Sequence, residues 1–334
     1  MSSLLPSNSI QAPRMGAITA FVRDDLHAVE RVFAQTLASE SPHVQHLIEH
    51  LSHYRGKRLR PVLHLLVAQA CGRVTREHHV IAAVIEMIHT ATLVHDDVLD
   101  NATTRRHVPT INANWGNRAS ILLGDLLFTH AFHLVSTLGN AATCEAIGAA
   151  TNRVCAGELQ QISLRGNLQL SEREYFEIID GKTAELTACA CELGARHAGA
   201  SPEIVEAMET YGRALGQAFQ IADDLLDLVG EESAAGKTLG TDLDEQKATL
   251  PLIRLFERSS PAERQRLQQL IREQGRNCRA EICQALEQTG ALHYARAKAS
   301  ALIDTARAAL QVLPDSPARE CLEQLTDWTV LRDR

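Results

Sequence analysis

The chain has 334 residues and a formal net charge of −8, with 45% hydrophobic but only 4% aromatic residues. This acidic balance, without a basic face or interleaved aromatic and basic residues, excludes general nucleic-acid binding. No stretch of about 18 consecutive apolar residues occurs, so we expect no transmembrane segment. The eight cysteines form no C-x-x-C pair, which favours reduced thiols in a cytoplasmic protein over disulfides or structural zinc.

Helical periodicity dominates from Ile18 onward, and no run alternates as a half-buried β-strand does. Gly and Pro divide this pattern into ten or more segments of helix length. Ser171 and Glu174 predict a capping box at the start of one helix, and Ser201-Pro202 predicts the start of another. No linker or charge shift divides the chain. We therefore expect one all-α domain over residues 1–334, with residues 1–17 as a flexible N-terminal tail.

The first candidate site residues form a basic cluster around Gly56. Arg55, Lys57, Arg58 and Arg60 surround this glycine just before a predicted helix. Backbone amides at a helix start can face an anion together with such cations. Taken alone, each cation would be an ordinary solvated surface charge.

An aspartate-rich motif, D-D-x-x-D, follows the next helix. Residues 80–94 are apolar nearly all round, which predicts a helix buried in the middle of a bundle. Asp96, Asp97 and Asp100 come directly after it, and the i, i+4 spacing places Asp96 and Asp100 on one face. Carboxylates on such a helix resist burial unless a cation lies between them, and oxygen ligands suit Mg²⁺.

A second D-D-x-x-D motif repeats this arrangement behind residues 214–222. It comprises Asp223, Asp224 and Asp227. Gly212, Gly216 and Gln220 form an i, i+4, i+8 row upstream, which leaves room either for a second helix or for a ligand. Solvated helix ends are the alternative to metal sites, but exposed carboxylates have no reason to repeat the same spacing. The repeat favours metal sites that share Mg²⁺ with a phosphate.

Further cations that could meet phosphate oxygens lie beside the two motifs: Arg105, Arg106, Lys182 next to Thr183, Lys237 and Lys247. With these in place, residues 88–106 resemble the first aspartate-rich motif of the trans-isoprenyl diphosphate synthases. Residues 56–61 resemble their G-K-R-x-R-P motif, although Arg55 replaces the usual first glycine. Residues 181–184, 219–224 and 236–243 match further motifs in family order. The resemblance covers roughly residues 57–252 and is greatest to octaprenyl- and solanesyl-type synthases.

The resemblance implies a single all-α bundle around a central cavity, with the two motifs at its mouth. About three Mg²⁺ ions would neutralise an allylic diphosphate there, and isopentenyl diphosphate would add to the resulting carbocation. Carried over by position, the metal ligands are Asp96, Asp97, Asp100, Asp223 and Asp227, with Asp224 either supporting these ligands from behind or reaching metal through water. The residues for the allylic diphosphate are Arg105, Lys182, Gln220 and Lys237, and those for isopentenyl diphosphate are Lys57, Arg60, His89 and Arg106.

Two more positions acquire roles in the same way. Thr183, beside a kink that Gly181 permits, would turn its backbone oxygen toward the carbocation, and Lys247 matches a further family lysine. The resemblance also implies a homodimer, to which the apolar residues 121–138 are candidate contributors.

The product is expected to be long. Short-chain relatives place aromatic residues four or five positions before the first aspartate, whereas this chain has Thr92 and Ala91 there. We therefore expect a trans polyprenyl diphosphate of hexaprenyl length or longer. The alternatives are a short-chain farnesyl or geranylgeranyl synthase and a subunit that needs a small helper protein.

Two other enzyme classes fit less well. His95-Asp96 is also the signature dipeptide of an all-α class of metal-dependent phosphohydrolases, but the second motif has no role in that class. Terpene cyclases of the same fold normally replace the second motif by a mixed Asn, Ser and Glu site.

Overall fold

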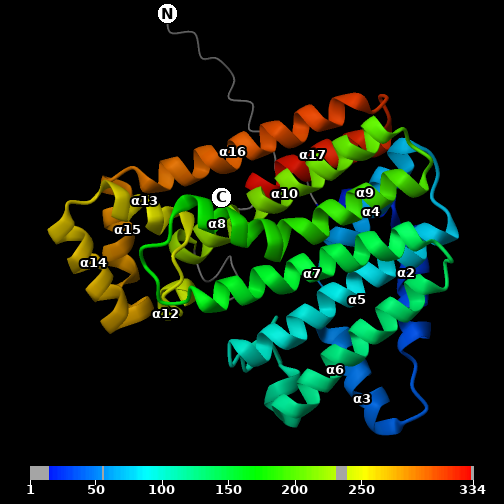
Figure 1. Cartoon of the computed structure of the whole chain (residues 1–334), viewed down its shortest axis with the longest axis horizontal. Helices are drawn as coiled ribbons and strands as arrows, with labels where there is room; N and C mark the ends of the chain where they lie inside the picture. Colours follow the sequence, from blue (N-terminus) through cyan, green and yellow to red (C-terminus); the bar gives the residue numbers. More distant parts are fainter. Residues whose placement is uncertain (1–14, 55, 231–238, 332–334) are drawn as a thin grey trace, which may run out of the picture.

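Long α-helices run side by side through the molecule, and the shorter helices α12, α13, α14 and α15 gather at one end (Figure 1). This computed structural model describes residues 15–54, 56–230 and 239–331. The all-α class and the expected ten or more helices are confirmed. In chain order the elements are α1 (Met15–Phe21), α2 (Arg23–Leu37), α3 (Pro42–Leu51), η1 (Ser52–Tyr54), α4 (Leu59–Cys71), α5 (Arg76–Leu99), β1 (Thr104–Arg105), β2 (Val108–Pro109), α6 (Ile111–Ser136), α7 (Ala141–Ser163), α8 (Glu172–Ile179), η2 (Asp180–Ala184), α9 (Glu185–His197), α10 (Pro202–Val229), α12 (Thr241–Asp244), α13 (Leu250–Arg258), α14 (Pro261–Gln274), η3 (Gly275–Cys278), α15 (Arg279–Gln288), α16 (Ala291–Ala309), η4 (Leu310–Val312) and α17 (Pro317–Leu331).

Two expectations need correction. Residues 15–17, assigned to a flexible tail, are the first turn of α1, and residues 1–14 lie outside the described residues. A minimal antiparallel hairpin, β1 with β2, follows the first D-D-x-x-D motif and pairs Arg105 with Val108. Two-residue strands are too short for a period-2 pattern, which is why the sequence did not indicate them.

Helix α5 is the buried central helix that its apolar sequence predicted. It packs along α6 on one side and against α2, α4 and α9 on others, so most of its residues from Val80 to Val94 are buried. Both predicted helix starts are confirmed: Ser171 and Glu174 form the capping box of α8, and Pro202 is in the first turn of α10.

The row of small residues on α10 allows close helix packing. A Cβ atom at Gly212 would lie 2.6 Å from the Thr187 carbonyl oxygen, and one at Gly216 would lie 2.6 Å from Ala184 Cα. Both neighbours are backbone atoms that cannot swing away. The row therefore brings α10 against η2 and α9, while Gln220 at its end faces a cavity.

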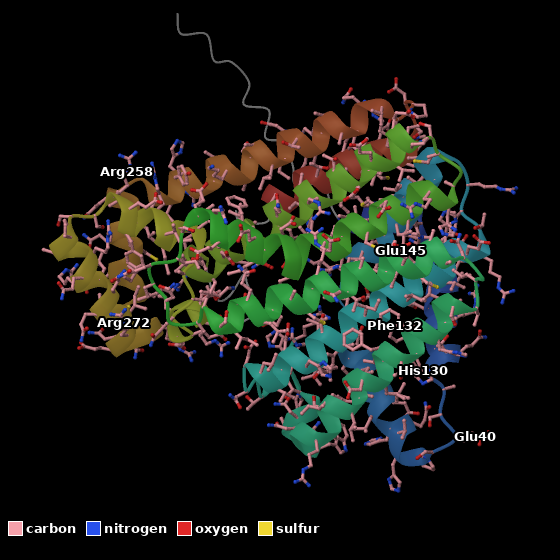
Figure 2. The ribbon with its side chains drawn as sticks, viewed as in Figure 1. Glu40, His130, Phe132, Glu145, Arg258 and Arg272 are labelled. Atoms are coloured by element: carbon pink, nitrogen blue, oxygen red, sulfur yellow. The ribbon has the colours of Figure 1, made fainter. Side chains whose placement is uncertain are left out.

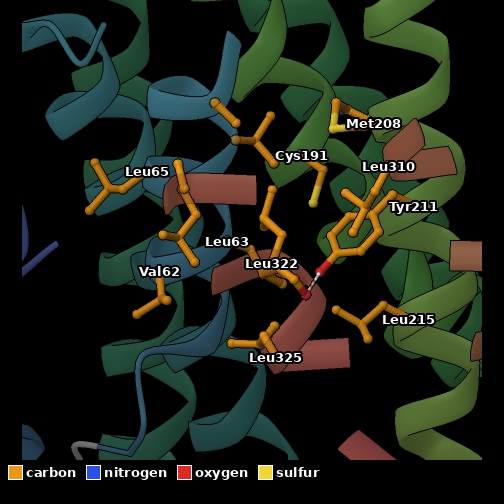
Figure 3. Packing of buried hydrophobic residues seen from close by; sticks show 14 of the residues in the cluster. Val62, Leu63, Leu65, Cys191, Met208, Tyr211, Leu215, Leu310, Leu322 and Leu325 are labelled. Carbon is orange, nitrogen blue, oxygen red and sulfur yellow. Dashed lines mark hydrogen bonds between the residues drawn. The ribbon is translucent and has the colours of Figure 1, made fainter. Parts of the chain in front are cut away.

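One part of the core lies where α4, α9, α10 and α17 meet (Figure 3). Tyr211 is fully buried there and donates a hydrogen bond to the Leu322 carbonyl oxygen at 3.0 Å. Because a buried hydroxyl without a partner is costly, this bond fixes the C-terminal helix against α10. All eight cysteines lie within the described residues and are free.

Helix α6 is the one helix of the described ranges that is long and apolar enough to cross a membrane. Only 33% of the window that meets this test is buried inside the protein. The same helix packs along α5, and its helical geometry is broken at Gly116. The sequence predicted no transmembrane segment. By length and composition alone, α6 is the one helix of the described residues that counts against this prediction.

Histidine 64 makes the stability of the fold depend on pH. Its buried Nδ1 lies 2.8 Å from the Ala190 carbonyl oxygen, and burial, followed by His78, lowers the pKa of His64 from 6.5 to about 3. Because only the unfolded chain takes up this proton, the stabilising contribution is complete above pH 6.5 and is lost as pH falls toward 3. In urea titrations the free energy of unfolding should rise with pH between about 3 and 6.5. This rise should be less steep in His64→Met, by up to about 1.4 kcal/mol per pH unit. Equal slopes in the two proteins would contradict this assignment.

Candidate active site

The two D-D-x-x-D motifs face one cavity of ≈ 420 Å³. Asp96, near the end of α5, and Asp223, on α10, both line it. The other predicted site residues on its wall are Lys57, Arg60, His89, Thr92, Arg106, Lys182, Thr183 and Gln220. Residues distant in sequence thus converge as the motifs implied.

The remaining predicted residues lie off this wall. They are Asp97, Asp100, Asp224, Asp227, Arg105, Lys247 and Ala91. Lys247 lines a smaller adjoining cavity with Lys182, Thr183 and Gln220. Ala91 is fully buried in the core cluster that joins α5 to α6, α7 and α9. Lys237 lies outside the described residues.

The second aspartate of each motif is held by a tyrosine. Asp97 is fully buried and accepts hydrogen bonds from the Tyr54 hydroxyl at 2.8 Å and from Arg105 Nε at 2.9 Å. Asp224, also buried, accepts from the Tyr175 hydroxyl at 2.6 Å and from Gln220 Nε2 at 2.8 Å. These hydrogen bonds hold the ends of α5 and α10 in place.

The last aspartate of each motif also has partners. Asp100 Oδ1 lies 2.9 Å from Arg165 Nη2, which reaches Glu245 at 3.3 Å. Asp227 accepts from the Thr241 hydroxyl and from the Asp242 backbone N–H, both at 3.0 Å. Asp227 thereby fixes the start of α12 against α10.

The first aspartate of the first motif, Asp96, is partly buried close to other carboxylates. Burial is the main reason that the pKa of Asp96 rises to about 7, although Lys182 Nζ, 4.0 Å away, opposes the rise. Nearby Glu158 and Asp100 raise it further. A carboxylate in this position is stabilised by an added cation.

The donor set fits Mg²⁺ shared with a ligand. Among the residues that the structure describes, no three His, Cys, Asp or Glu side chains are arranged to hold a metal by themselves. Mg²⁺ is commonly bound by one or two carboxylates together with water and substrate phosphate. Asp96 and Asp223 on the cavity wall supply carboxylates of this kind.

The same cavity is also lined by the cations Lys57, Arg60 and Arg106, which we call the arginine wall. Burial lowers the pKa of Arg60, and burial together with Arg105 lowers that of Arg106. Nε of Arg60 is buried without a hydrogen-bond partner in the described structure. Burial and the neighbouring arginines also hold the pKa of His89 well below its ordinary value, so this imidazole is neutral. An anionic ligand would relieve the repulsion among these groups.

Two residues that the motifs did not indicate support this wall. Glu86, buried in the middle of α5, forms an ion pair with Arg58 at 2.6 Å. Trp328 on α17 lies under Lys57, whose Nζ is 4.4 Å from the indole ring centroid. The C-terminal segment carries no family motif, so this cation–π contact had no signal in the sequence.

The cavity is also lined by η2, a single turn of π-helix. Its Lys182 pairs with Glu158 of α7 at 2.5 Å, and the Thr183 hydroxyl donates to Gln220 Oε1 at 2.9 Å. The Thr183 carbonyl oxygen, expected to face a carbocation, accepts from the Thr187 hydroxyl at 3.3 Å. The kink expected at Gly181 is therefore real, and it takes the π form.

Glycine 157 on α7 lets that helix pack directly against η2. A Cβ there would lie 2.6 Å from the Lys182 backbone nitrogen and 3.0 Å from the Gly181 carbonyl carbon. We expect Gly157→Ala to lower the free energy of unfolding by about 1–3 kcal/mol and to lower kcat by displacing Lys182. Gly148→Ala, on the same helix with no atom within 4 Å, is the matched control and should stabilise by about 0.5–1 kcal/mol. Equal effects of both on unfolding and turnover would refute the close-packing argument.

His95 points away from the reaction cavity. Its Nε2 lies 3.0 Å from the Ile121 carbonyl oxygen, and its ring occupies the space that Gly124 leaves on α6. This position does not fit the His-Asp metal pair of a phosphohydrolase.

Helix bundle, paired motifs and two-walled cavity together define an enzyme of the isoprenoid-synthase type. The Polyprenyl synthetase family matches residues 41–289. The octaprenyl diphosphate synthase of Escherichia coli (strain K12) is 38% identical over 95% of this chain and 98% of its own length. A short chain isoprenyl diphosphate synthase of Methanothermobacter thermautotrophicus is also 38% identical, over 85% of this chain and 89% of its own.

A solved structure agrees with this assignment. The polyprenyl synthase of Caulobacter crescentus CB15, complexed with calcium and isoprenyl diphosphate, superposes with a TM-score of 0.91 at 36% identity, covering 97% of this chain and 99% of that one. The chain therefore belongs to the polyprenyl synthetase family and is a prenyltransferase.

Proposed function

We propose that this enzyme condenses isopentenyl diphosphate with an allylic diphosphate, repeatedly, to form a long trans polyprenyl diphosphate. One observation carries the proposal. A single cavity brings together a carboxylate wall, formed by Asp96 and Asp223, and an arginine wall, formed by Lys57, Arg60 and Arg106. Two diphosphate esters, one bound through metal and one bound directly, satisfy both walls.

The carboxylate wall is the proposed site of the allylic diphosphate. Mg²⁺, when bound by Asp96, Asp100 and Asp223, would neutralise the diphosphate and lower the barrier to its departure. Lys182 lies beside Asp96 and can exchange its Glu158 contact for a phosphate oxygen. The related Caulobacter crescentus polyprenyl synthase is complexed with calcium and isoprenyl diphosphate, which supports binding of a divalent cation and a prenyl diphosphate here.

The arginine wall is the proposed site of isopentenyl diphosphate. Lys57, Arg60 and Arg106 would contact its phosphates, and neutral His89 can donate one hydrogen bond without adding charge. As the allylic C–O bond breaks, the electron pair leaves with pyrophosphate. The double bond of isopentenyl diphosphate then attacks the allylic cation, and a proton is lost to pyrophosphate. The protein contributes positioning and electrostatic stabilisation and no nucleophile of its own.

A long product is supported by the wall next to the first motif. Thr92 faces the cavity, and Val154, Leu186 and Thr187 line it from α7 and α9. None of these side chains is aromatic. The aromatic residues that line the cavity come from other elements: Tyr54 from η1, Phe219 from α10 and Trp328 from α17. Equal identity to an octaprenyl synthase and to a short-chain synthase means that overall similarity does not discriminate between products, so the wall residues carry the argument.

Exposed apolar side chains support a homodimer. Leu122 on α6 and Leu159 on α7 are each 68% exposed, and Phe132 on α6 also lies at the surface (Figure 2). Apolar surface of this kind is typical of a protein–protein interface. Light scattering should give the mass of two chains at micromolar concentration, and a monomer there would refute the dimer.

The activity is tested with the purified chain alone, farnesyl diphosphate and radiolabelled isopentenyl diphosphate. We expect incorporation into prenyl products that stops on chelation and returns with added Mg²⁺. Incorporation that appears only with a second protein would favour the helper-dependent alternative. A cytoplasmic location remains the prediction from the cysteine pattern.

A further inference from the structure

The π-turn η2 interrupts a continuous helical path from α8 into α9. The Glu185 backbone N–H donates to the Asp180 carbonyl oxygen, five residues earlier, instead of to the residue four earlier. Such turns are rare and cluster at functional sites. Lys182 and Thr183 occupy its middle and line the reaction cavity.

One arginine joins the two ends of this turn. Arg213 Nη1 on α10 lies 3.1 and 3.0 Å from the two carboxylate oxygens of Asp180 and 2.8 Å from Glu185 Oε2. In an α-helix, side chains five residues apart diverge by about 140° around the axis. In a π-turn they lie one above the other, as the i→i+5 hydrogen bond requires. The contacts of Arg213 with both carboxylates therefore favour the π register.

The surroundings hold this guanidinium in place. Glu209, one helical turn earlier, accepts from Arg213 Nη2 at 2.9 Å, and Gln217 donates to Asp180 at 2.9 Å. Arg153 of α7 reaches the same two carboxylates at 3.2 Å, but its side chain is 55% exposed, compared with 25% for Arg213. Ion pairs at more exposed side chains are weaker, so Arg213 links Asp180 to Glu185 more strongly than Arg153 does.

We propose that Arg213 is a positioning residue that selects the π register of η2 and thereby aims Lys182 and Thr183 at the substrates. The inference rests on the proposed function, in which Lys182 contacts the allylic diphosphate, and on the role near the carbocation that the family resemblance implies for Thr183. A return to α-helical register would rotate the turn by about 100° relative to the following helix. Thr183 would then lose Gln220, which is itself bonded to Asp224 of the second motif.

Steady-state kinetics of Arg213 variants test the proposal. We expect Arg213→Gln to lower kcat by about 10²-fold because small misplacements have effects of that size. The KM for isopentenyl diphosphate should not change, because the arginine wall is untouched. Arg213→Lys should recover part of the loss, since an ammonium keeps the charge but lacks the planar fork that spans both carboxylates. Arg266→Gln, which breaks exposed ion pairs with Glu263 and Glu281, is the matched control and should leave kcat unchanged.

A double-mutant cycle separates this role from general stability. In the Lys182→Ala/Thr183→Ala background, Arg213→Gln should lower kcat little further, because Arg213 acts on kcat through those two residues. An equal fold-loss of kcat in the wild-type and the Lys182→Ala/Thr183→Ala backgrounds would overturn the proposal. Wild-type kcat in the Lys182→Ala/Thr183→Ala protein would instead overturn the roles proposed for these two residues. Hydrogen exchange of the backbone amides of residues 180–185 should be faster in Arg213→Gln and unchanged in Arg266→Gln.

Discussion

Replacing Asp96 by Asn should lower kcat by about 10²–10³-fold even at saturating Mg²⁺. Asp96 is a carboxylate on the cavity wall whose pKa burial raises to about 7, so an added cation stabilises its negative charge further. Asn keeps the shape of the side chain but offers one neutral oxygen. Condensation should be measured with farnesyl and isopentenyl diphosphates over a range of Mg²⁺ concentrations.

Asp304→Asn is the control for this experiment. Asp304 is an exposed residue of α16 that pairs with Arg307 at 3.1 Å, and it lies outside the cavity. Its variant should retain wild-type turnover and the same Mg²⁺ dependence. Near-wild-type turnover of Asp96→Asn would reject Asp96 as a metal ligand.

The second large effect concerns product length. Thr92→Phe should shorten the dominant product to farnesyl or geranylgeranyl length while leaving the first condensation nearly intact. Thr92 faces the cavity one helical turn before Asp96, so an aromatic ring there would block the growing prenyl tail. Chromatography of the dephosphorylated alcohols measures the change, and an unchanged product distribution would show that the tail takes another path.

Ala91 and Thr305 provide comparisons. Ala91 is fully buried in the core, so Ala91→Phe should cost about 1–3 kcal/mol of stability in addition to any shortening. Thr305 is exposed on α16, and Thr305→Phe should change neither product nor turnover. The sequence placed Ala91 and Thr92 together at the wall, whereas the helix rotates only Thr92 toward the cavity.

Features set by local sequence could be predicted. The all-round apolar pattern of α5 implies a buried central helix, and the Ser171 capping box needs only residues within one turn. The i, i+4 spacing of the aspartates likewise follows from helix geometry. These signals do not depend on which helices become neighbours.

Features created by packing between distant segments could not be predicted. The tyrosines that hold Asp97 and Asp224, and the glutamate that pairs with Lys182, come from elements far away in sequence with no shared spacing. The π form of the kink at Gly181 is a similar case. It depends on Arg213 and on close approach by Gly157, and neither is visible until α7 and α10 lie on either side of η2.

The central claim is that this chain, by itself, elongates an allylic diphosphate to a long prenyl product. The most direct measurement incubates the purified protein with Mg²⁺, farnesyl diphosphate and excess isopentenyl diphosphate, followed by chromatography of the dephosphorylated alcohols. We predict all-trans alcohols of hexaprenyl length or longer as the main products. Geranylgeraniol as the dominant end product, or unreacted farnesol alone, would contradict it.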